Sequence, residues 1–123
     1  MSTTTLTNIA ELDSQLNAQI LKGDILGAFD AFYAEDVVMQ ENSAAPTAGK
    51  AVNRAREEQF VASIEQFHGA KLLASAASGD VGFSEWEIDA TYKGAGRFAL
   101  AQAAVRHWKD GKVASERFYY SKG

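Results

Sequence analysis

Cysteine is absent from this chain and histidine is rare, and each absence excludes a kind of site. Without cysteine the protein has no disulfide framework, no thiolate nucleophile and no cysteine metal site. The two histidines, His68 and His107, cannot form a metal cluster by themselves. The glycines fall at or beside predicted turns, and none belongs to a phosphate-binding loop. We therefore expect a protein that uses no metal, no nucleotide and no other cofactor.

Positive charge and long apolar runs are also scarce. The 12 Lys and Arg residues are outnumbered by 16 Asp and Glu residues, and the formal net charge is -4. This balance argues against nucleic acid and against an anionic membrane surface, because both are bound mainly through Lys and Arg. No apolar run approaches the ~18 residues of a membrane span, and the first residues lack the basic and apolar regions of a secretory signal. We expect a soluble, cytoplasmic protein.

The composition is that of a globular domain. Of the 123 residues, 46% are hydrophobic and 23% are charged, which is ordinary for a soluble globular protein that can bury a core. We expect a flexible N-terminal segment, residues 1–7, followed by one domain that spans residues 8–123.

Three segments have the apolar spacing of helices. Asn8, followed three residues later by Glu11, is typical of a helix start, and Asp24 is a natural N-cap for a short second helix. A third helix is predicted from about Lys50 to Gln66. Its expected inward side chains are Val52, Ala55, Phe60, Ile64 and Phe67, and its expected outward ones are Arg54, Arg56, Glu57 and Glu58.

Alternating patterns predict five strands. The first runs from Asp36 to Glu41, and the others span residues 70–78, 81–92, 97–109 and 112–120. Asp110-Gly111 between the last two is a strong hairpin signal. Residues 42–49, which include the single proline, are predicted to form a loop. Helices followed by hairpin-connected strands predict an α+β fold, in which three helices pack on one face of a curved antiparallel or mixed β-sheet.

The predicted turns also set a register. A two-residue turn at Asp110-Gly111 pairs His107 with Ala114 and Val105 with Glu116, and a four-residue turn ending at Gly96 pairs Trp86 with Ala103. One face is then mostly apolar, as a ligand pocket is. It carries Ser84, Trp86, Ile88, Ala90, Ala101, Ala103, Val105, His107, Ala114, Glu116, Phe118 and Tyr120. The opposite face carries charge and two aromatics, and we expect a homodimer through Arg106, Trp108, Arg117 and Tyr119.

Glu41 is the candidate catalytic base. In a strand it shares a face with Val37 and Met39, and the pKa of a carboxylate rises in apolar surroundings. On the predicted register His107 and Glu116 also share a face, where a hydrogen bond between them would orient the imidazole for proton transfer. The expected substrate-binding residues are Met39, Trp86, Ile88, Val105, Phe118 and Tyr120. The alternatives are a hydrated or lysine-paired Glu41 at the pocket rim and a purely structural pair of His107 and Glu116.

The order of these features resembles a known superfamily. Tyr33-Ala34-Glu35-Asp36 before an alternating strand, the Gly23-Asp24 break and Trp108-Lys109-Asp110-Gly111-Lys112-Val113 are similar to segments of NTF2-like proteins. Within these the chain resembles SnoaL-like domains, which include relatives of polyketide cyclases and ketosteroid isomerases. The resemblance implies a cone-shaped, cystatin-like fold with a cavity between helices and sheet. It also implies a homodimer formed through the outer face of the sheet.

The resemblance carries over only part of the family's chemistry. Glu41 falls where ketosteroid isomerases place their proton-shuttling carboxylate, but Leu16 and Val105 stand where those enzymes have oxyanion donors. Phe118 aligns with the aspartate of SnoaL-like cyclases, and Glu116 lies two residues earlier. Epoxide hydrolases use an arginine and paired aspartates, which at best correspond to Glu87 and Asp89 without an arginine between them.

Two functions of different classes are therefore predicted. The first is a small cofactor-independent enzyme that moves a proton on an apolar, carbonyl-bearing or polycyclic molecule, with Glu41 as base and His107 and Glu116 as a proton relay. The second is a noncatalytic ligand-binding or dimerisation module of the same fold.

Overall fold

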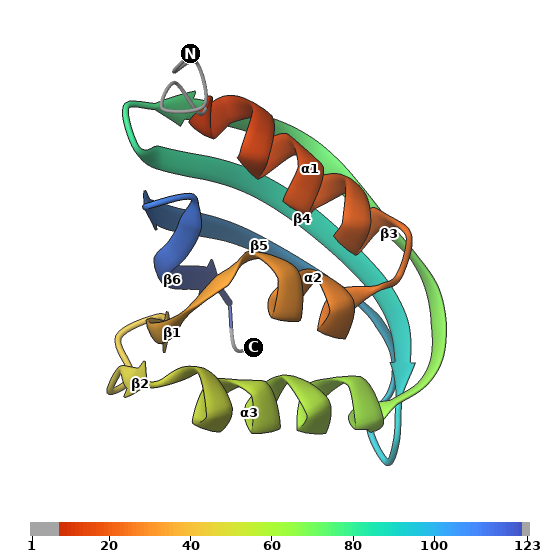
Figure 1. Cartoon of the computed structure of the whole chain (residues 1–123). Coiled ribbons are helices and arrows are strands. Elements are labelled where there is room, and N and C mark those ends of the chain that lie inside the picture. Colours follow the sequence, from red (N-terminus) through yellow and green to blue (C-terminus); the bar gives the residue numbers. More distant parts are fainter. Residues whose placement is uncertain (1–7, 122–123) are drawn as a thin grey trace.

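A curved sheet holds three helices on its concave side (Figure 1). The structure, a computed structural model, describes residues 8–121, so the flexible segment expected at residues 1–7 lies outside the described residues. The elements are α1 (Ile9–Leu21), α2 (Ile25–Phe32), β1 (Tyr33–Glu41), β2 (Thr47–Ala48), α3 (Lys50–Ser63), β3 (Ile64–Ser78), β4 (Val81–Tyr92), β5 (Gly96–Lys109) and β6 (Lys112–Tyr120). None of the helices within residues 8–121 is long and apolar enough to cross a membrane.

The first two helices begin where their capping residues predict. The side chain of Asn8 accepts a hydrogen bond from the backbone N–H of Glu11, at 3.3 Å, and the side chain of Asp24 accepts one from Gly27, at 3.0 Å. Each cap satisfies an N–H group that has no partner within its helix. Both predicted helix starts are confirmed.

The strands form one mixed sheet in the order β2-β1-β6-β5-β4-β3. β1 runs parallel to β6, and every other neighbouring pair is antiparallel. Three irregularities along the β3–β4 ladder bend these long strands. The curvature carries the far end of the sheet around α3, as the strands on the right of Figure 1 show. The predicted α+β architecture is confirmed.

Two segment boundaries differ from the prediction. The third helix ends at Ser63, and the residues up to Ala70 that were predicted as helix and junction belong to β3. Ile64 already pairs with Tyr92, so the ladder with β4 competes with the helix for these residues. The predicted loop at residues 42–49 contains the short strand β2, which pairs with β1.

The predicted register of β5 against β6 is wrong by one residue. The first pairs after the turn are as expected, but His107 then pairs with Ser115 instead of Ala114. A β-bulge at this point leaves Ala114 without a partner of its own and shifts every later pair. As a result, Arg106 lies opposite Glu116.

The predicted register of β4 against β5 is also wrong by one residue. Tyr92 pairs with Gly96 across a three-residue loop, where a four-residue turn was predicted. Trp86 therefore pairs with Gln102 instead of Ala103. A shift of one residue turns every side chain of a strand to the opposite face.

This shift exchanges the two faces of β5. Arg106 and Trp108, which were predicted on the outer face, are 1% and 2% exposed and lie on the concave side. Val105 and His107, which were predicted on the pocket face, lie on the outer side, and His107 is exposed. Ala101 and Ala103 move outward with them, and the inward positions belong to Phe98, Leu100, Gln102 and Ala104.

The orientation of α3 also differs from the prediction. Val52 is 54% exposed and Phe67 39% exposed, whereas the predicted inward positions required both to be buried. Asn53 is buried instead, and its amide donates to the carbonyls of Thr47 and Gly49, each at 2.9 Å. These bonds fix the rotation of α3 so that Asn53, Glu57 and Phe60 face inward.

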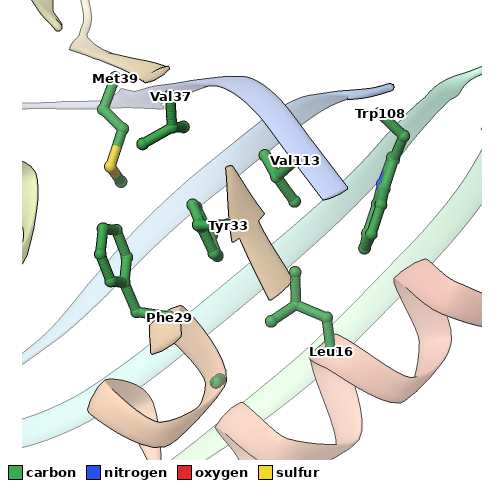
Figure 2. Close-up of a cluster of buried hydrophobic side chains, with 8 residues drawn as sticks. Leu16, Phe29, Tyr33, Val37, Met39, Trp108 and Val113 are labelled. Atoms are coloured by element: carbon green, nitrogen blue, oxygen red, sulfur yellow. The ribbon is translucent and has the colours of Figure 1, made fainter. Parts of the chain in front are cut away.

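A hydrophobic core joins α1 and α2 to the strands (Figure 2). Each fully buried apolar side chain contributes about 1.5–3 kcal/mol relative to exposure. The core contains Leu16, Ala28, Phe29, Tyr33, Val37, Met39, Trp108 and Val113. Phe29, Tyr33 and Met39 also line a cavity, so the core holds one wall of the candidate site.

Candidate functional site

A cavity of about 970 Å³ lies between the helices and the concave face of the sheet. Small-molecule sites usually have volumes of about 300–1,000 Å³. Its walls are mainly apolar and aromatic. They include Leu16, Ile20, Ile25, Ala28, Phe29, Met39, Phe60, Trp86, Ile88, Tyr92, Phe98, Leu100 and Phe118.

The sheet side of the cavity is built by alternation. Trp86 and Ile88 from β4 and Leu100 from β5 point inward, because inward and outward side chains alternate along each strand. The indole N–H of Trp86 donates to the hydroxyl of Ser84 at 2.8 Å. This bond satisfies the polar edge of the indole and leaves its ring in the cavity wall.

Glu41 occupies the polar part of the wall at the end of β1. The hydroxyl of Tyr120 donates to one oxygen of its carboxylate, and the guanidinium of Arg56 donates to the other at 2.9 Å. The hydrogen bond to Glu41, and then burial, raise the pKa of Tyr120 to about 12. Tyr120 thus remains a protonated donor, and the candidate base lies between a phenol and a cation.

A second carboxyl group, that of Glu116, lies deeper and is fully paired. Arg106 donates to one of its oxygens at 2.7 Å, and the hydroxyl of Tyr33 donates to the other. Burial, and then the charge of Glu116, raise the pKa of Tyr33 well above its usual value. The cavity wall therefore contains a buried ion pair between Arg106 and Glu116, and Tyr33 donates to the second carboxylate oxygen of Glu116.

Helix α1 completes this network from behind. Arg106 also donates to the side chains of Asn17, at 2.6 Å, and Asp13, at 3.2 Å. The indole of Trp108 donates to the same oxygen of Asp13 at 3.1 Å. Burial alone lowers the pKa of Arg106, but Glu116 and the other acidic groups raise it overall, so this guanidinium stays charged. A buried charge of this kind is tolerated because its hydrogen bonds are satisfied.

Glu57 is the third carboxyl group of the cavity, and it comes from α3. It is half-buried, and within residues 8–121 its carboxyl group has neither a hydrogen bond nor an ion pair. Burial, and then the neighbouring carboxylates of Glu116 and Glu41, raise the pKa of Glu57 to about 7. This side chain can therefore gain or lose a proton near neutral pH.

The structure brings most of the predicted site residues to one cavity. Its lining includes Glu41, Glu116, Met39, Trp86, Ile88, Phe118 and Tyr120. Val105 and His107 instead line a smaller hollow of about 270 Å³ on the outer face. The expectation that His107 shares the inner face with Glu116 is wrong. The bulge and the shorter loop shift the register of β5, so its side chains point to the opposite faces from those predicted. No hydrogen bond joins these two side chains among the described residues.

The sequence analysis missed several polar residues of the site. Arg106 was assigned to the outer face, Arg56 and Glu57 were assigned to solvent, and Tyr33 was given no role. A signal existed for Glu57, because it lies four residues after Asn53 and three before Phe60 and so shares their helix face. No group of His, Cys, Asp and Glu side chains in residues 8–121 is arranged to hold a metal ion.

Comparison with known proteins adds a family and a fold. The sequence model of the SnoaL-like domain family matches residues 7–120. No curated protein matches the sequence. Among solved structures, a candidate SnoaL-like polyketide cyclase from Mesorhizobium loti is 26% identical, with a TM-score of 0.84 over 93% of this chain and 100% of its own.

Two more distant structures share the fold. A candidate polyketide cyclase from Pseudomonas putida is 24% identical, with a TM-score of 0.75 over 94% of this chain and 93% of its own. An epoxide hydrolase of the LEH-like type from M. tuberculosis is 19% identical, with a TM-score of 0.70 over 92% of this chain and 81% of its own.

Proposed function

Because this chain belongs to the SnoaL-like domain family, we propose that it binds a small apolar or polycyclic molecule in its cavity and catalyses a proton transfer on it without a cofactor. The reaction would be of the isomerase, cyclase or dehydratase type. The observation that supports this most is one apolar cavity whose wall holds Glu41 beside the phenol of Tyr120. The relative from Mesorhizobium loti, described as a candidate polyketide cyclase, is consistent with it.

The proposed step uses a base and a donor that are already adjacent. The carboxylate of Glu41 takes a proton from the carbon next to a carbonyl, and the electron pair of that C–H bond moves toward the carbonyl oxygen. The hydroxyl of Tyr120 then donates to the developing oxyanion instead of to Glu41. Return of the proton to the same or another carbon of the substrate restores Glu41. In this proposal, Tyr120 of β6 replaces the oxyanion donors that ketosteroid isomerases have at the positions of Leu16 and Val105.

Binding can be tested with 2-naphthalenemethanol, a bicyclic probe of suitable size. The chain has two tryptophans, which give two indole N–H signals in a ¹H–¹⁵N NMR spectrum. Trp86 lines the cavity, whereas Trp108 is buried outside its lining. We expect the signal of Trp86 to shift in a saturable way and that of Trp108 to change little. Equal shifts of both signals, or none, would contradict a cavity site.

Catalysis can be tested with 2-tetralone, an apolar ketone with exchangeable protons beside its carbonyl. In D₂O the protein should accelerate the loss of these protons, which ¹H NMR follows directly. Glu41→Gln should slow the catalysed exchange by about 10²-fold or more, because a positioned base contributes about that factor. Glu35→Gln makes the same change at an exposed position of β1 and should leave the rate unchanged.

The second proposed function is a noncatalytic ligand-binding or dimerisation module. The pairing of both oxygens of Glu41, with Arg56 and Tyr120, favours it, because each oxygen would have to give up a partner to reach a substrate proton. Saturable binding of the naphthalene probe together with an exchange rate that Glu41→Gln does not alter would support this function over the enzyme.

We also propose that two copies associate through the outer face of the sheet. Arg117 lies 4.9 Å from the ring centre of Tyr119, and both remain on that face. Phe83, Val105 and Arg117 are successive partners across β4, β5 and β6, and Phe83 is 42% exposed. This row joins apolar and cationic groups, as protein interfaces commonly do. Arg106 and Trp108 take no part, because both are buried on the concave side.

A further inference from the structure

The described cavity lining holds more carboxyl groups than cations. Arg56 pairs with Glu41 at 2.9 Å, and Arg106 pairs with Glu116 at 2.7 Å. Arg106 also faces Asp13 at 3.2 Å from behind the wall. Each cation of the described cavity lining is thus matched by a carboxylate, and within residues 8–121 Glu57 has no cation as its partner.

The cation that partly compensates the charge of Glu57 is Arg56, whose guanidinium is already paired with Glu41. Its side chain lines the cavity from α3, on the same helix face as Asn53 and Phe60. The titratable or charged groups that line the cavity around it are Arg56 from α3, Tyr33 and Glu41 from β1, Tyr92 from β4, Arg106 from β5, and Glu116 and Tyr120 from β6. Both guanidiniums in this set are held by other carboxylates. Ionised Glu57 therefore calls for a cation that residues 8–121 do not supply.

The walls near this carboxyl group are aromatic. Phe60 lies one turn further along α3, its ring 6.4 Å from that of Tyr92, which in turn stacks on Phe98 at 4.5 Å. Trp86 and Phe118 line the sheet side. The faces of aromatic rings attract cations, and this attraction is stronger when the cation is desolvated.

We propose that the cavity recognises a hydrophobic amine, whose ammonium group forms an ion pair with Glu57 while its apolar body packs on the aromatic walls. This inference rests on the proposed binding of a small molecule in the same cavity and narrows its chemical class. The amine enters as the protonated species, and the neutral carboxylic acid of Glu57 releases its proton to water as the ion pair forms. Burial raises the pKa of Glu57 to about 7, so this release takes place below neutral pH and vanishes above it.

Three naphthalene probes of nearly equal shape but different charge show how much the charge of the ligand contributes to its affinity. They are 2-naphthylmethylamine, which is cationic, 2-naphthalenemethanol, which is neutral, and 2-naphthoic acid, which is anionic. Titration calorimetry at pH 8 should show the amine binding at least about ten-fold more tightly than the alcohol, because hydrogen bonds to charged groups are the stronger kind. The acid should bind more weakly than the alcohol.

Proton release gives a second readout. At pH 6, calorimetry in buffers of different ionisation enthalpy should show about one proton released for each amine bound, and the alcohol should release none. At pH 8 the release should be close to zero for both probes. These values are independent of the absolute affinities.

A pair of adjacent variants assigns the effect to one residue. Glu57→Gln should bring the amine and the alcohol to within about two-fold of each other and abolish the proton release. Glu58→Gln removes the same charge at the next position, where the carboxylate pairs with Arg54 at 3.1 Å, and should behave as the unaltered protein does. A ¹H–¹⁵N spectrum of each variant verifies that the fold is retained.

The possible failures are distinguishable. If all three probes bind with similar affinity, or if the preference for the amine survives Glu57→Gln, the assignment to Glu57 is wrong while the proposed binding function stands. If none of the probes binds, the cavity is not a site for small molecules and both proposals are overturned.

Discussion

Glu57 shows how one side chain can connect the cavity to the stability of the whole protein. Its pKa is raised from the ordinary value of 4.5 to about 7, chiefly by burial and then by Glu116 and Glu41. Between these two pH values the folded state holds a proton that the unfolded state has lost. The folded state is therefore stabilised at the acidic end of this window, and the free energy of unfolding falls as pH rises toward 7.

We expect Glu57→Gln to remove this dependence. Glutamine has about the same size and no ionisable proton, so the variant should gain stability over the unaltered protein as pH rises from 5 to 8, by about 3 kcal/mol at most. Urea denaturation at several pH values between 5 and 8 measures the difference. For Glu58→Gln, the free energy of unfolding should depend on pH in the same way as for the unaltered protein. A constant difference between Glu57→Gln and the unaltered protein across this range would show that Glu57 titrates at an ordinary pH.

At the scale of elements, the packing of α1 on the sheet depends on a glycine. An ideal Cβ atom built on Gly82 would lie 2.4 Å from Cγ of Asp13, so β4 has no room for a side chain there. Asp13 cannot move away freely, because it bonds to Arg106 at 3.2 Å and Trp108 at 3.1 Å. The close approach of helix and strand thus aligns the buried ion pair of the cavity wall.

Gly82→Ala should therefore destabilise the protein. The added methyl group either moves α1 from β4 or displaces Asp13 from its partners, and overpacking of this kind costs about 1–3 kcal/mol. The same change in an Asp13→Ala background should cost clearly less, because the clash is gone, and the double-mutant cycle gives the coupling. Equal costs in both backgrounds, measured by urea denaturation, would exclude this contact as the cause.

For β5, the sequence patterns predicted the presence of the strand but not its register. Its existence and its end at Lys109 were predicted, and so were both bounds of β4 and β6. Its register was not, because Phe98 to Lys109 contains apolar residues on both faces and alternation does not choose between them. A three-residue loop and a bulge decided the choice. Gly94 and Gly96, both with positive φ, mark the turn but do not set its length. The error moved His107 out of the candidate site and Arg106 into it.

At the scale of the whole molecule, the two faces of the sheet differ in what they present. The concave face and the helices enclose the cavity, and the outer face presents Phe83, Tyr119 and Arg117. Tyr119 is 44% exposed. Specific interfaces bury about 800 Å² per partner, and aromatic residues and arginine are enriched in them. Dimerisation through this face would leave the cavity untouched.

We expect Tyr119→Asp to shift the protein from dimer to monomer. The substitution places a charge in the proposed interface, where it would be desolvated without a partner. Size-exclusion chromatography with light scattering over a range of concentrations gives the molar mass directly. Val52→Asp makes a comparable change at a site on α3 that is 54% exposed, and should leave the mass unchanged. A monomeric unaltered protein, or a dimer that survives Tyr119→Asp, would rule out this interface.

The sequence by itself determined the local features of this protein: helix starts at Asn8 and Asp24, the hairpin at Asp110-Gly111, and the inward direction of Glu41 and Trp86. These follow from capping, turn chemistry and alternation, which act between residues close in the chain.

Only the tertiary structure decided which charges meet in the cavity. Arg106 contacts Glu116 because a bulge shifts one strand, and it contacts Asn17 because α1 crosses the sheet beside it. Glu57 faces inward because Asn53 fixes the rotation of α3 through bonds to a neighbouring loop and strand. Such contacts join residues far apart in the chain, and their energies depend on burial that no local pattern records.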